Sequence, residues 1–277
     1  KGNQGILYYL MKNYKDVHIT NGKLMTFSER LPIVSFFSGA GGLDLGFHQA
    51  GFETVFAADN DSASVNTFNA NTGYRNIAHQ QDLSSIHVQS IIGTIEKIGT
   101  KPVGAIGGPP CQGFSRGNCK SYADDPRNKL PSAYAKLVSA LREKFDLDFF
   151  IFENVPGIRN ARHADTYNRL KNSFNEAGFI LFEGEIESSR FGVPQIRRRL
   201  LLVGINRFKY PTINFTFPKG RNCSLTVRDV IGNLPEPVFF SKSLTPDQIP
   251  FHKNHWTMVP RSKKFSDNTA AGGRSFR

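Results

Sequence analysis

The chain has 277 residues, of which 39% are hydrophobic, which is enough for one full-sized core and a small second lobe. Its formal net charge of +12 favours a polyanionic partner, because each cation set against a phosphate releases condensed counterions. The chain contains no apolar run near the roughly 20 residues of a membrane span and does not begin with a signal segment, so we expect a cytoplasmic protein that binds nucleic acid rather than a membrane.

Three cysteines are present, Cys111, Cys119 and Cys223. Their odd number and the lack of a closely spaced pair argue against a disulfide framework and against a structural metal site. We therefore expect a reducing compartment and no bound metal.

Short apolar runs alternate with helical stretches from Leu31 onward, which is typical of a parallel sheet built from βαβ units. The predicted strands are Ile33 to Phe37, Thr54 to Ala58, Val103 to Ile106, Phe149 to Phe152, Ile180 to Glu185 and Leu200 to Ile205. The predicted helices are Ser62 to Asn71, Ser84 to Ile98, Pro131 to Phe145 and Ala164 to Ala177.

The composition divides the chain into three regions. Residues 1–30 are polar and read as an appended arm, and residues 31–207 carry the alternating pattern. In residues 208–277 prolines punctuate a segment rich in Lys, Arg, Asn and aromatic residues, which predicts a second domain. A proline-rich surface excursion of a single domain would give the same composition.

A glycine-rich turn, Phe37-Ser38-Gly39-Ala40-Gly41-Gly42, follows the first predicted strand and allows a ligand to approach the backbone closely. It is not a dinucleotide motif, because Asp44 stands where the third glycine would be. Asp59 and Asp82 follow the next two apolar runs, where acids can bind ribose hydroxyls, although such acids often only cap helices or turns. Together these features favour a nucleoside cofactor.

Cys111 lies in the loop Gly107-Gly108-Pro109-Pro110-Cys111-Gln112, directly after a predicted strand. A free cysteine is usually a small buried hydrophobe, but glycine and proline neighbours offer little apolar surface to bury it. A thiol at the carboxyl end of a strand is placed for nucleophilic attack. Cys111 is therefore a candidate nucleophile.

Charged residues follow at two further strand ends. Glu153 ends an apolar strand, where an acid is costly to bury unless it binds something, although it could also cap the next helix. In Gln195-Ile196-Arg197-Arg198-Arg199, an extended backbone would put Arg197 and Arg199 on one face, able to hold a phosphate or a base carbonyl. A solvated charge cluster is the alternative for these arginines.

Taken in order, four segments resemble the DNA cytosine-5 methyltransferase family of bacterial type, as found in restriction-modification systems. These segments are Phe37 to Gly42, Pro110 to Gln112, Glu153 to Val155 and Gln195 to Arg199, within a match from about Pro32 to about Pro235. The resemblance implies a Rossmann-like S-adenosylmethionine-dependent methyltransferase fold with a mostly parallel sheet. It makes residues 31–207 the catalytic domain and residues 208–277 part of a target-recognition region.

The resemblance also implies a reaction, in which a methyl group passes from S-adenosylmethionine to C5 of a cytosine flipped out of duplex DNA. Cys111 matches the nucleophile that adds to C6. Glu153 matches the contact to N3 and the exocyclic amine, and Arg199 the contact to the base carbonyl, with Arg197 beside it. The base that removes the C5 proton is not identified by the sequence.

The same resemblance assigns contacts to the cofactor and to the substrate. Phe37 is expected to pack against adenine, Gly39 and Gly41 to approach the methionine moiety, Asp59 to bind the ribose and Asp82 the adenine amino group. The expected cofactor contacts are Phe37, Ser38, Gly39, Ala40, Gly41, Gly42, Asp59, Asn60, Asp82, Leu83 and Pro109. The expected substrate contacts are Pro110, Gln112, Ser115, Arg116, Asn154 and Gln195, and the loop from Gln112 to Asn128 is expected to be mobile without DNA.

Three departures from the family pattern affect these expectations. The family commonly has an acid where Ser35 stands, so a polar contact near the cofactor turn is missing or replaced. Asp59 is shorter than the glutamate often found there. The family's late motifs are absent, so we expect a fragment or one subunit of a split enzyme, otherwise a monomer, with weak cofactor binding by this chain alone.

Three alternatives remain at this stage. The first keeps the chemistry but acts on tRNA, and the second is a nucleic-acid-binding relative that has lost catalysis. The third, a nicotinamide-dependent oxidoreductase, is disfavoured by the glycine spacing and by Pro110-Cys111-Gln112. The sequence does not identify the recognised DNA site.

Overall fold

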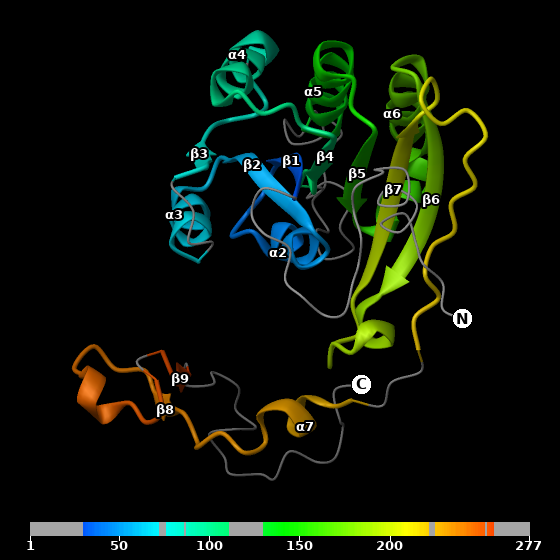
Figure 1. Ribbon diagram of the computed structural model, residues 1–277. Coiled ribbons are helices and arrows are strands. Elements are labelled where there is room, and N and C mark those ends of the chain that lie inside the picture. The colour runs from blue at the N-terminus through cyan, green and yellow to red at the C-terminus, as the bar shows by residue number, and fades with distance from the viewer. Residues whose placement is uncertain are drawn as a thin grey trace, which may run out of the picture. The chain divides into compact units, whose positions relative to one another are not determined.

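The computed structural model describes residues 30–71, 76–85, 87–110, 130–221, 225–252 and 254–257 (Figure 1). All structural statements concern these ranges. They form two compact units, residues 30–186 with 198–219 and residues 187–197 with 220–257, and each unit is described by itself.

The first unit contains a seven-stranded sheet with the strand order β3-β2-β1-β4-β5-β7-β6. Its strands are β1 (Leu31–Phe36), β2 (Phe52–Asp59), β3 (Ala78–Gln80), β4 (Gly104–Gly107), β5 (Phe149–Asn154), β6 (Phe179–Glu187) and β7 (Arg198–Asn206). The pairs β1 with β2, β1 with β4, β2 with β3 and β4 with β5 are parallel, and β5 with β7 is antiparallel. The expectation of a mostly parallel sheet is confirmed.

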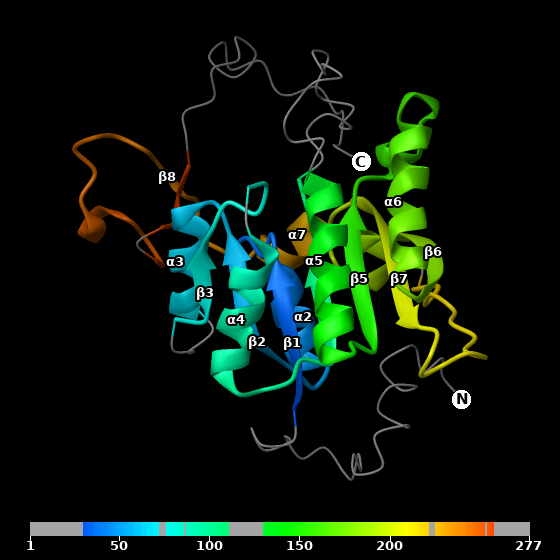
Figure 2. The same ribbon diagram turned by 90° about the horizontal axis from the view of Figure 1, so that it is seen from above.

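Helices cover both faces of this sheet (Figures 1 and 2). One face carries α4 (Val88–Ile98), α5 (Leu130–Phe145) and α6 (Ala164–Glu176), and the other carries α2 (Gly42–Gln49) and α3 (Ser62–Asn71). Each layer buries its own apolar cluster, a large one beneath α4, α5 and α6 and two smaller ones on the α2 and α3 side. The sheet is therefore enclosed between helices, as parallel sheets usually are.

Tyr134 of α5 lies at the centre of the larger cluster and is fully buried. Its hydroxyl donates to the carbonyl of Ile151 at 2.7 Å, and its burial raises the pKa of the phenol well above 10. A Cβ on Gly107 would lie 2.5 Å from the Tyr134 ring, so only glycine lets α5 pack this closely on the end of β4. This packing positions the segment that precedes Cys111.

The predicted strands and helices are all present, with bounds shifted by a few residues. Two helices were not predicted, α2 and the short α7 (Val227–Ile231). Because α2 contains Gly42 and Gly46, which disfavour helix, its residues read as a turn in the sequence. Phe37 was placed in the first strand, but it has a φ of 53° and lies beyond the strand's end.

The second unit has little regular structure among its described residues. It contains α7 and a parallel pair of two-residue strands, β8 (Val238–Phe239) and β9 (Trp256–Thr257). A capping box begins α7, in which the Thr226 side chain accepts from the Asp229 amide and the Asp229 carboxylate accepts from the Thr226 amide. In the described part of the chain, none of the helices is long and apolar enough to cross a membrane.

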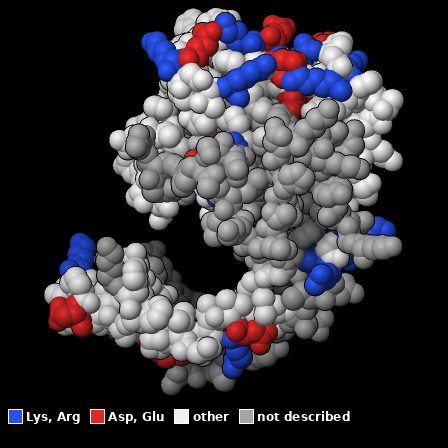
Figure 3. All heavy atoms as spheres, viewed as in Figure 1, with Lys and Arg blue, Asp and Glu red and all other residues white. Residues whose placement is uncertain are grey.

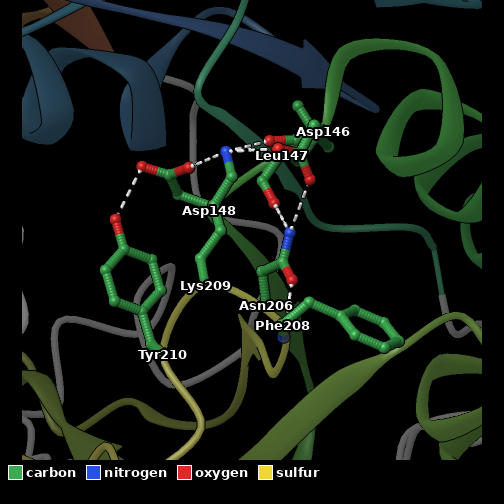
Figure 4. A network of polar contacts seen from close by, with 7 residues as sticks. All are labelled: Asp146, Leu147, Asp148, Asn206, Phe208, Lys209 and Tyr210. Carbon is green, nitrogen blue, oxygen red and sulfur yellow. Dashed lines mark hydrogen bonds and ion pairs between the residues drawn. The ribbon is translucent and has the colours of Figure 1, made fainter.

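A polar network around the buried Asp148 joins the start of β5 to the chain after β7 (Figure 4). Lys209 Nζ lies 2.6 Å from Asp148 Oδ1 and 3.0 Å from Asp146 Oδ2, and the Tyr210 hydroxyl donates to Asp148 Oδ2 at 3.0 Å. Asn206 Nδ2 donates to the carbonyl of Leu147 at 2.8 Å. Asp148 is only 4% exposed, so its charge depends on these partners.

The pKa values of Asp146 and Lys209 are shifted in opposite directions. Burial opposes the charge of Asp146, but hydrogen bonding and the charge of Lys209 outweigh it and lower the Asp146 pKa below 3.8. Burial likewise opposes the charge of Lys209, but hydrogen bonds to Asp148 and Asp146 raise its pKa above 10.5. The contribution of Asp146 to stability is present above pH 3.8 and is lost as the pH falls through its folded pKa, whereas that of Lys209 is present below pH 10.5 and is lost as the pH rises through its folded pKa.

We predict that Lys209→Met lowers the free energy of unfolding by about 3 kcal/mol at pH 7, because Asp148 then loses the Lys209 ammonium group while staying buried. Urea denaturation measures this difference, which should shrink at the acidic and alkaline limits. Lys144→Met is the control, because the exposed pair of Lys144 with Glu96 is worth less than about 1 kcal/mol. Equal losses in the two variants would contradict the prediction.

Candidate functional site

The predicted site residues follow strands whose carboxyl ends meet at one edge of the sheet. Phe36 of β1 is in register with Ala58 of β2 and with Gly107 of β4, and Gly107 is in register with Phe152 of β5. Side chains and turns after these four strands are therefore neighbours, as expected for a ligand site in a parallel sheet.

The glycine-rich turn after β1 has three residues with positive φ, Phe37 at 53°, Gly39 at 53° and Gly41 at 87°. The amide of Ser38 donates to the carbonyl of Ala58 at 3.2 Å, and the amide of Gly41 donates to the carbonyl of Ser38 at 3.1 Å. Glycine adopts such angles at no steric cost, whereas an aromatic residue does so only when its surroundings impose the conformation. The turn leads directly into α2.

Asp59, at the end of β2, holds this turn. Its Oδ2 accepts from the amide of Gly39 at 2.8 Å, and its Oδ1 accepts from the amide of Asp61 at 2.9 Å. A carboxylate oxygen can accept more than one hydrogen bond, so each oxygen retains capacity for a ligand donor. The neighbouring Asn60 is exposed, and its carbonyl accepts from Gln80 Nε2 at 3.2 Å.

Asp82 is exposed and forms a local turn after β3. Its Oδ1 accepts from the hydroxyl of Ser84 at 2.7 Å and from the amide of Ser84 at 2.9 Å, and these bonds lower the pKa of its carboxyl group. Leu83 is 2% exposed and packs into the larger core cluster. Asp82 thus already has the role of a turn residue, and its carboxylate remains accessible.

The cysteine loop is described only as far as Pro110. Four of the predicted residues, Cys111, Gln112, Ser115 and Arg116, lie outside the described residues. Asn154 at the end of β5 is 3% exposed, and its Nδ2 donates to the carbonyl of Pro109 at 3.2 Å while its Oδ1 accepts from the amide of Val155 at 2.7 Å. The side chain of Asn154 therefore ties β5 to the backbone two residues before Cys111.

Glu153 and Arg199 meet at the same edge, brought together by the antiparallel pairing of β5 with β7. Arg199 Nε lies 2.7 Å from Glu153 Oε1, and both side chains are partly exposed. A Cβ on Gly108 would lie 3.0 Å from Glu153 Oε2, so the carboxylate approaches the cysteine loop at a glycine. The structure thus brings together an acid, a guanidinium and the segment that precedes the predicted nucleophile.

Gln195 and Arg197 belong to the second unit, in the loop before β7. Their side chains are exposed, and the carbonyl of Arg197 accepts from the amide of Ser188 at 2.9 Å and from its hydroxyl at 3.1 Å. Extended structure begins only at Arg198, and the assignment of Arg197 beside Arg199 stays a prediction.

A buried cluster beneath the glycine-rich turn was missed from the sequence. Asp44 in the first turn of α2 is 3% exposed, and it accepts from the hydroxyls of Ser35 at 3.0 Å and Thr54 at 2.8 Å. Its burial raises the pKa of the carboxyl group, against the effect of these hydrogen bonds. Ser35, which stands where the family commonly has an acid, thus contacts an acid on α2. No sequence signal pointed to this cluster, because α2 was not predicted and its first turn was therefore not recognised as a place that favours negative charge.

A cavity of about 480 Å³ lies beside the turn, between α2 and α3. The described residues that line it are Ala40, Gly41, Gly42, Asp44, Leu45, His48, Thr54, Phe68, Asn71 and Ile77. Among the acids that follow the strands, neither Asp59 nor Asp82 is part of this lining. The cavity is thus separate from the predicted cofactor contacts after β2 and β3.

A mostly parallel seven-stranded sheet with one antiparallel strand, covered by helices on both faces and carrying a glycine-rich turn after β1, defines a Rossmann-like methyltransferase fold. The family model of C-5 cytosine-specific DNA methylases matches residues 31–273. The chain belongs to this family.

Named relatives support the same assignment. The type II methyltransferase M.MthTI of Methanothermobacter thermautotrophicus is 42% identical over 207 residues, covering 75% of this chain and 58% of the relative. The type II methyltransferase M1.HphI of Haemophilus parahaemolyticus is 30% identical, with 83% and 60% covered. A solved structure, a prophage-encoded DNA modification methyltransferase of E. coli, has 31% identity and a TM-score of 0.63, with 75% and 56% covered. This chain therefore spans less than two thirds of each of these proteins.

We predict that Gly41→Ala destabilises the protein by about 1–3 kcal/mol, because its Cβ would lie 2.8 Å from the Phe68 ring and its φ is 87°. Gly42→Ala is the matched control, since no atom lies within 4 Å of its Cβ, and it should be neutral or stabilising. Urea denaturation of both variants makes the comparison. Adding Phe68→Leu to Gly41→Ala should recover the part of the loss that comes from the clash with the Phe68 ring, but not the part that comes from the positive φ. Equal stability of Gly41→Ala and Gly42→Ala would contradict the prediction.

Proposed function

We propose that this chain carries the catalytic part of an enzyme that transfers a methyl group from S-adenosylmethionine to C5 of cytosine in duplex DNA. The observation that carries the proposal is the meeting of Glu153, Arg199 and the Gly-Pro segment before Cys111 at one sheet edge, in a chain of the C-5 cytosine-specific DNA methylase family. Each of these groups has a task in the chemistry of a cytosine ring.

The residues after β1 and β2 fit S-adenosylmethionine. The turn leaves open space at Gly39, where a Cβ would meet nothing within 4 Å, and the Asp59 carboxylate retains acceptor capacity for ribose hydroxyls. Phe37 is half-buried beside this turn and offers an aromatic face for a purine. When bound, S-adenosylmethionine supplies a methyl group on a positively charged sulfur. The chain's own residues hold it in place and activate the base.

Activation of the base requires a nucleophile, because C5 of cytosine is a poor one. In the proposed reaction the Cys111 thiolate forms a bond to C6, and the electron pair passed into the ring makes C5 able to accept the methyl group. Glu153 shares a proton with N3 as negative charge reaches the ring, and Arg199 holds the base carbonyl oxygen. Loss of the C5 proton to a base not yet identified then expels the thiolate.

Asn154 has a positioning role in this proposal. Its side-chain amide is engaged by the carbonyl of Pro109 and the amide of Val155, so it fixes the backbone that leads to Cys111. Glu153 precedes Asn154 in β5, and therefore one strand end places both the acid and the nucleophile loop. The proposed reaction needs Cys111 and Glu153 at a fixed separation, because both groups act on the same cytosine ring.

The net charge of +12 favours a nucleic-acid substrate, but the described residues of the α4 to α6 layer form no positive patch that would bind it in the view of Figure 3. Lys, Arg, Asp and Glu side chains are interspersed over that layer, so it presents no single-sign surface in this view (Figure 3). By contrast, residues 187–199 contain four arginines and one acid, which suits contact with phosphates. We therefore propose that residues 187–199 contact the phosphates of the DNA.

We predict that the chain with S-adenosylmethionine and a duplex containing 5-fluorocytosine forms a covalent adduct, because fluorine at C5 blocks the final proton loss. A denaturing gel detects the adduct. Cys111→Ala should abolish it, whereas Cys119→Ala should leave it intact. Trapping on fluorinated tRNA but on no duplex would overturn DNA as the substrate and favour the RNA alternative.

We also predict that Glu153→Gln lowers kcat for methyl transfer about 100- to 10,000-fold, because an amide cannot share a proton with N3. The KM for S-adenosylmethionine should stay near the wild-type value, since Glu153 is not among the predicted cofactor contacts. Glu185→Gln is the matched control, as Glu185 forms only an exposed pair with Arg159. A Glu153→Gln enzyme with unchanged kcat would exclude this role.

A further inference from the structure

Asp44 is a buried carboxylate whose hydrogen-bond donors are neutral. It is 3% exposed, and both of its oxygens accept from hydroxyl groups, those of Ser35 and Thr54. Among the described residues, no ion pair involves Asp44. A buried carboxylate held only by neutral donors lowers the stability of the fold, so we expect a functional role that explains its presence.

The hydrogen bond between Ser35 and Asp44 closes the base of the glycine-rich turn. Ser35 lies near the end of β1, and Asp44 lies in the first turn of α2, nine positions later. The chain between them is the turn from Phe37 to Gly41, so this single contact joins the two ends of the turn. The bond from Thr54 secures the same carboxylate to β2.

At its tip, the turn is held by a different acid. The Asp59 carboxylate accepts from the amide of Gly39, while the Phe68 ring packs against Gly41. Phe37, a non-glycine residue at a φ of 53°, keeps its conformation only if such contacts impose it. Loss of the contact at the base would let both ends of the turn move and would loosen the tip.

We propose that Asp44 is a positioning residue for S-adenosylmethionine, which holds the glycine-rich turn in its binding geometry by joining α2 to Ser35 and Thr54. This inference rests on the proposed function and concerns the cofactor part of that site. Asp44 does not touch the cofactor, and its effect is to spare the ligand the cost of ordering the turn.

The serine and the aspartate of this contact can be exchanged between positions 35 and 44. The hydrogen bond runs from a serine hydroxyl on β1 to a carboxylate on α2, and an aspartate at position 35 facing a serine at position 44 spans the same distance with the same atoms. A role that depends on the contact itself, and not on the identity of either residue, predicts that this exchange restores part of the function. A role in packing alone predicts no such rescue.

The experiment compares the wild type with Asp44→Leu, Ser35→Ala and the exchange variant Ser35→Asp with Asp44→Ser. Leucine fits because the adjoining cavity of about 480 Å³ gives it room, and removal of a buried charge should leave the urea midpoint unchanged or raised. Asp165→Leu is the control, because Asp165 is an exposed acid in the first turn of α6. The probe is S-adenosylmethionine, with Kd from equilibrium dialysis and kcat and KM from methyl transfer.

We expect Asp44→Leu to raise the Kd and KM for S-adenosylmethionine at least tenfold, with kcat at saturating cofactor near the wild-type value. Ser35→Ala should have a smaller effect in the same direction. The exchange variant rebuilds the bond between positions 35 and 44 but not the bond from Thr54, so its Kd should lie between those of Asp44→Leu and the wild type. A folded Asp44→Leu with unchanged Kd would overturn the proposal. If Asp44→Leu does not fold, an unchanged Kd in Ser35→Ala would overturn it.

Hydrogen exchange at the amides of Gly39 and Gly41 supplies a readout that needs no cofactor. These amides donate to Asp59 and to the Ser38 carbonyl, so they should exchange at least tenfold faster in Asp44→Leu and at the wild-type rate in Asp165→Leu. Faster exchange, combined with no S-adenosylmethionine binding by the wild-type chain, would mean that the contact at the base of the turn holds but that this chain does not bind the proposed cofactor. Unchanged exchange would show that Asp44 does not hold the turn.

Discussion

The parallel pairing of β1 with β2 and β4, and of β4 with β5, is the constraint on which the rest of the site depends. In a parallel sheet the carboxyl ends of neighbouring strands lie together, so residues far apart in sequence become neighbours without any other device. The glycine-rich turn and the cysteine loop follow strands of this set, and Asp59 and Glu153 lie at the carboxyl ends of β2 and β5. The antiparallel β7 then adds Arg199 from the opposite chain direction.

The polar groups at this edge are held by protein contacts before any ligand binds. Asp59 accepts from the turn, Asn154 holds the Pro109 carbonyl, and Glu153 pairs with Arg199. Such contacts fix the positions of side chains and loops, which lowers the entropy lost when a cofactor or a base enters. A ligand must then share these groups, and the Glu153 to Arg199 pair is suited to open onto a base because both side chains are partly exposed.

Two buried acids illustrate different ways of keeping a carboxylate inside this fold. Asp148 lies beside Lys209, which compensates its charge and joins β5 to the chain after β7 (Figure 4). Asp44 has hydroxyl partners, and its pKa is raised because burial outweighs their effect. The first arrangement suits stability, whereas the second holds a turn at the edge where the ligands are expected.

The sequence by itself determined the alternation of strands and helices, the family and the order of the site motifs, because these depend on local apolar patterns and on short residue strings. The apolar run from Phe149 to Phe152 predicts a strand whatever it packs against, and the motif Pro110-Cys111-Gln112 is recognised from the sequence alone. The sequence did not reveal α2, whose glycines resemble a turn, or the contacts of Asp44, Asn154 and Arg199. Their partners Ser35, Pro109 and Glu153 lie between 9 and 46 positions away, and only the register of the sheet and the packing of α2 bring them within hydrogen-bonding distance.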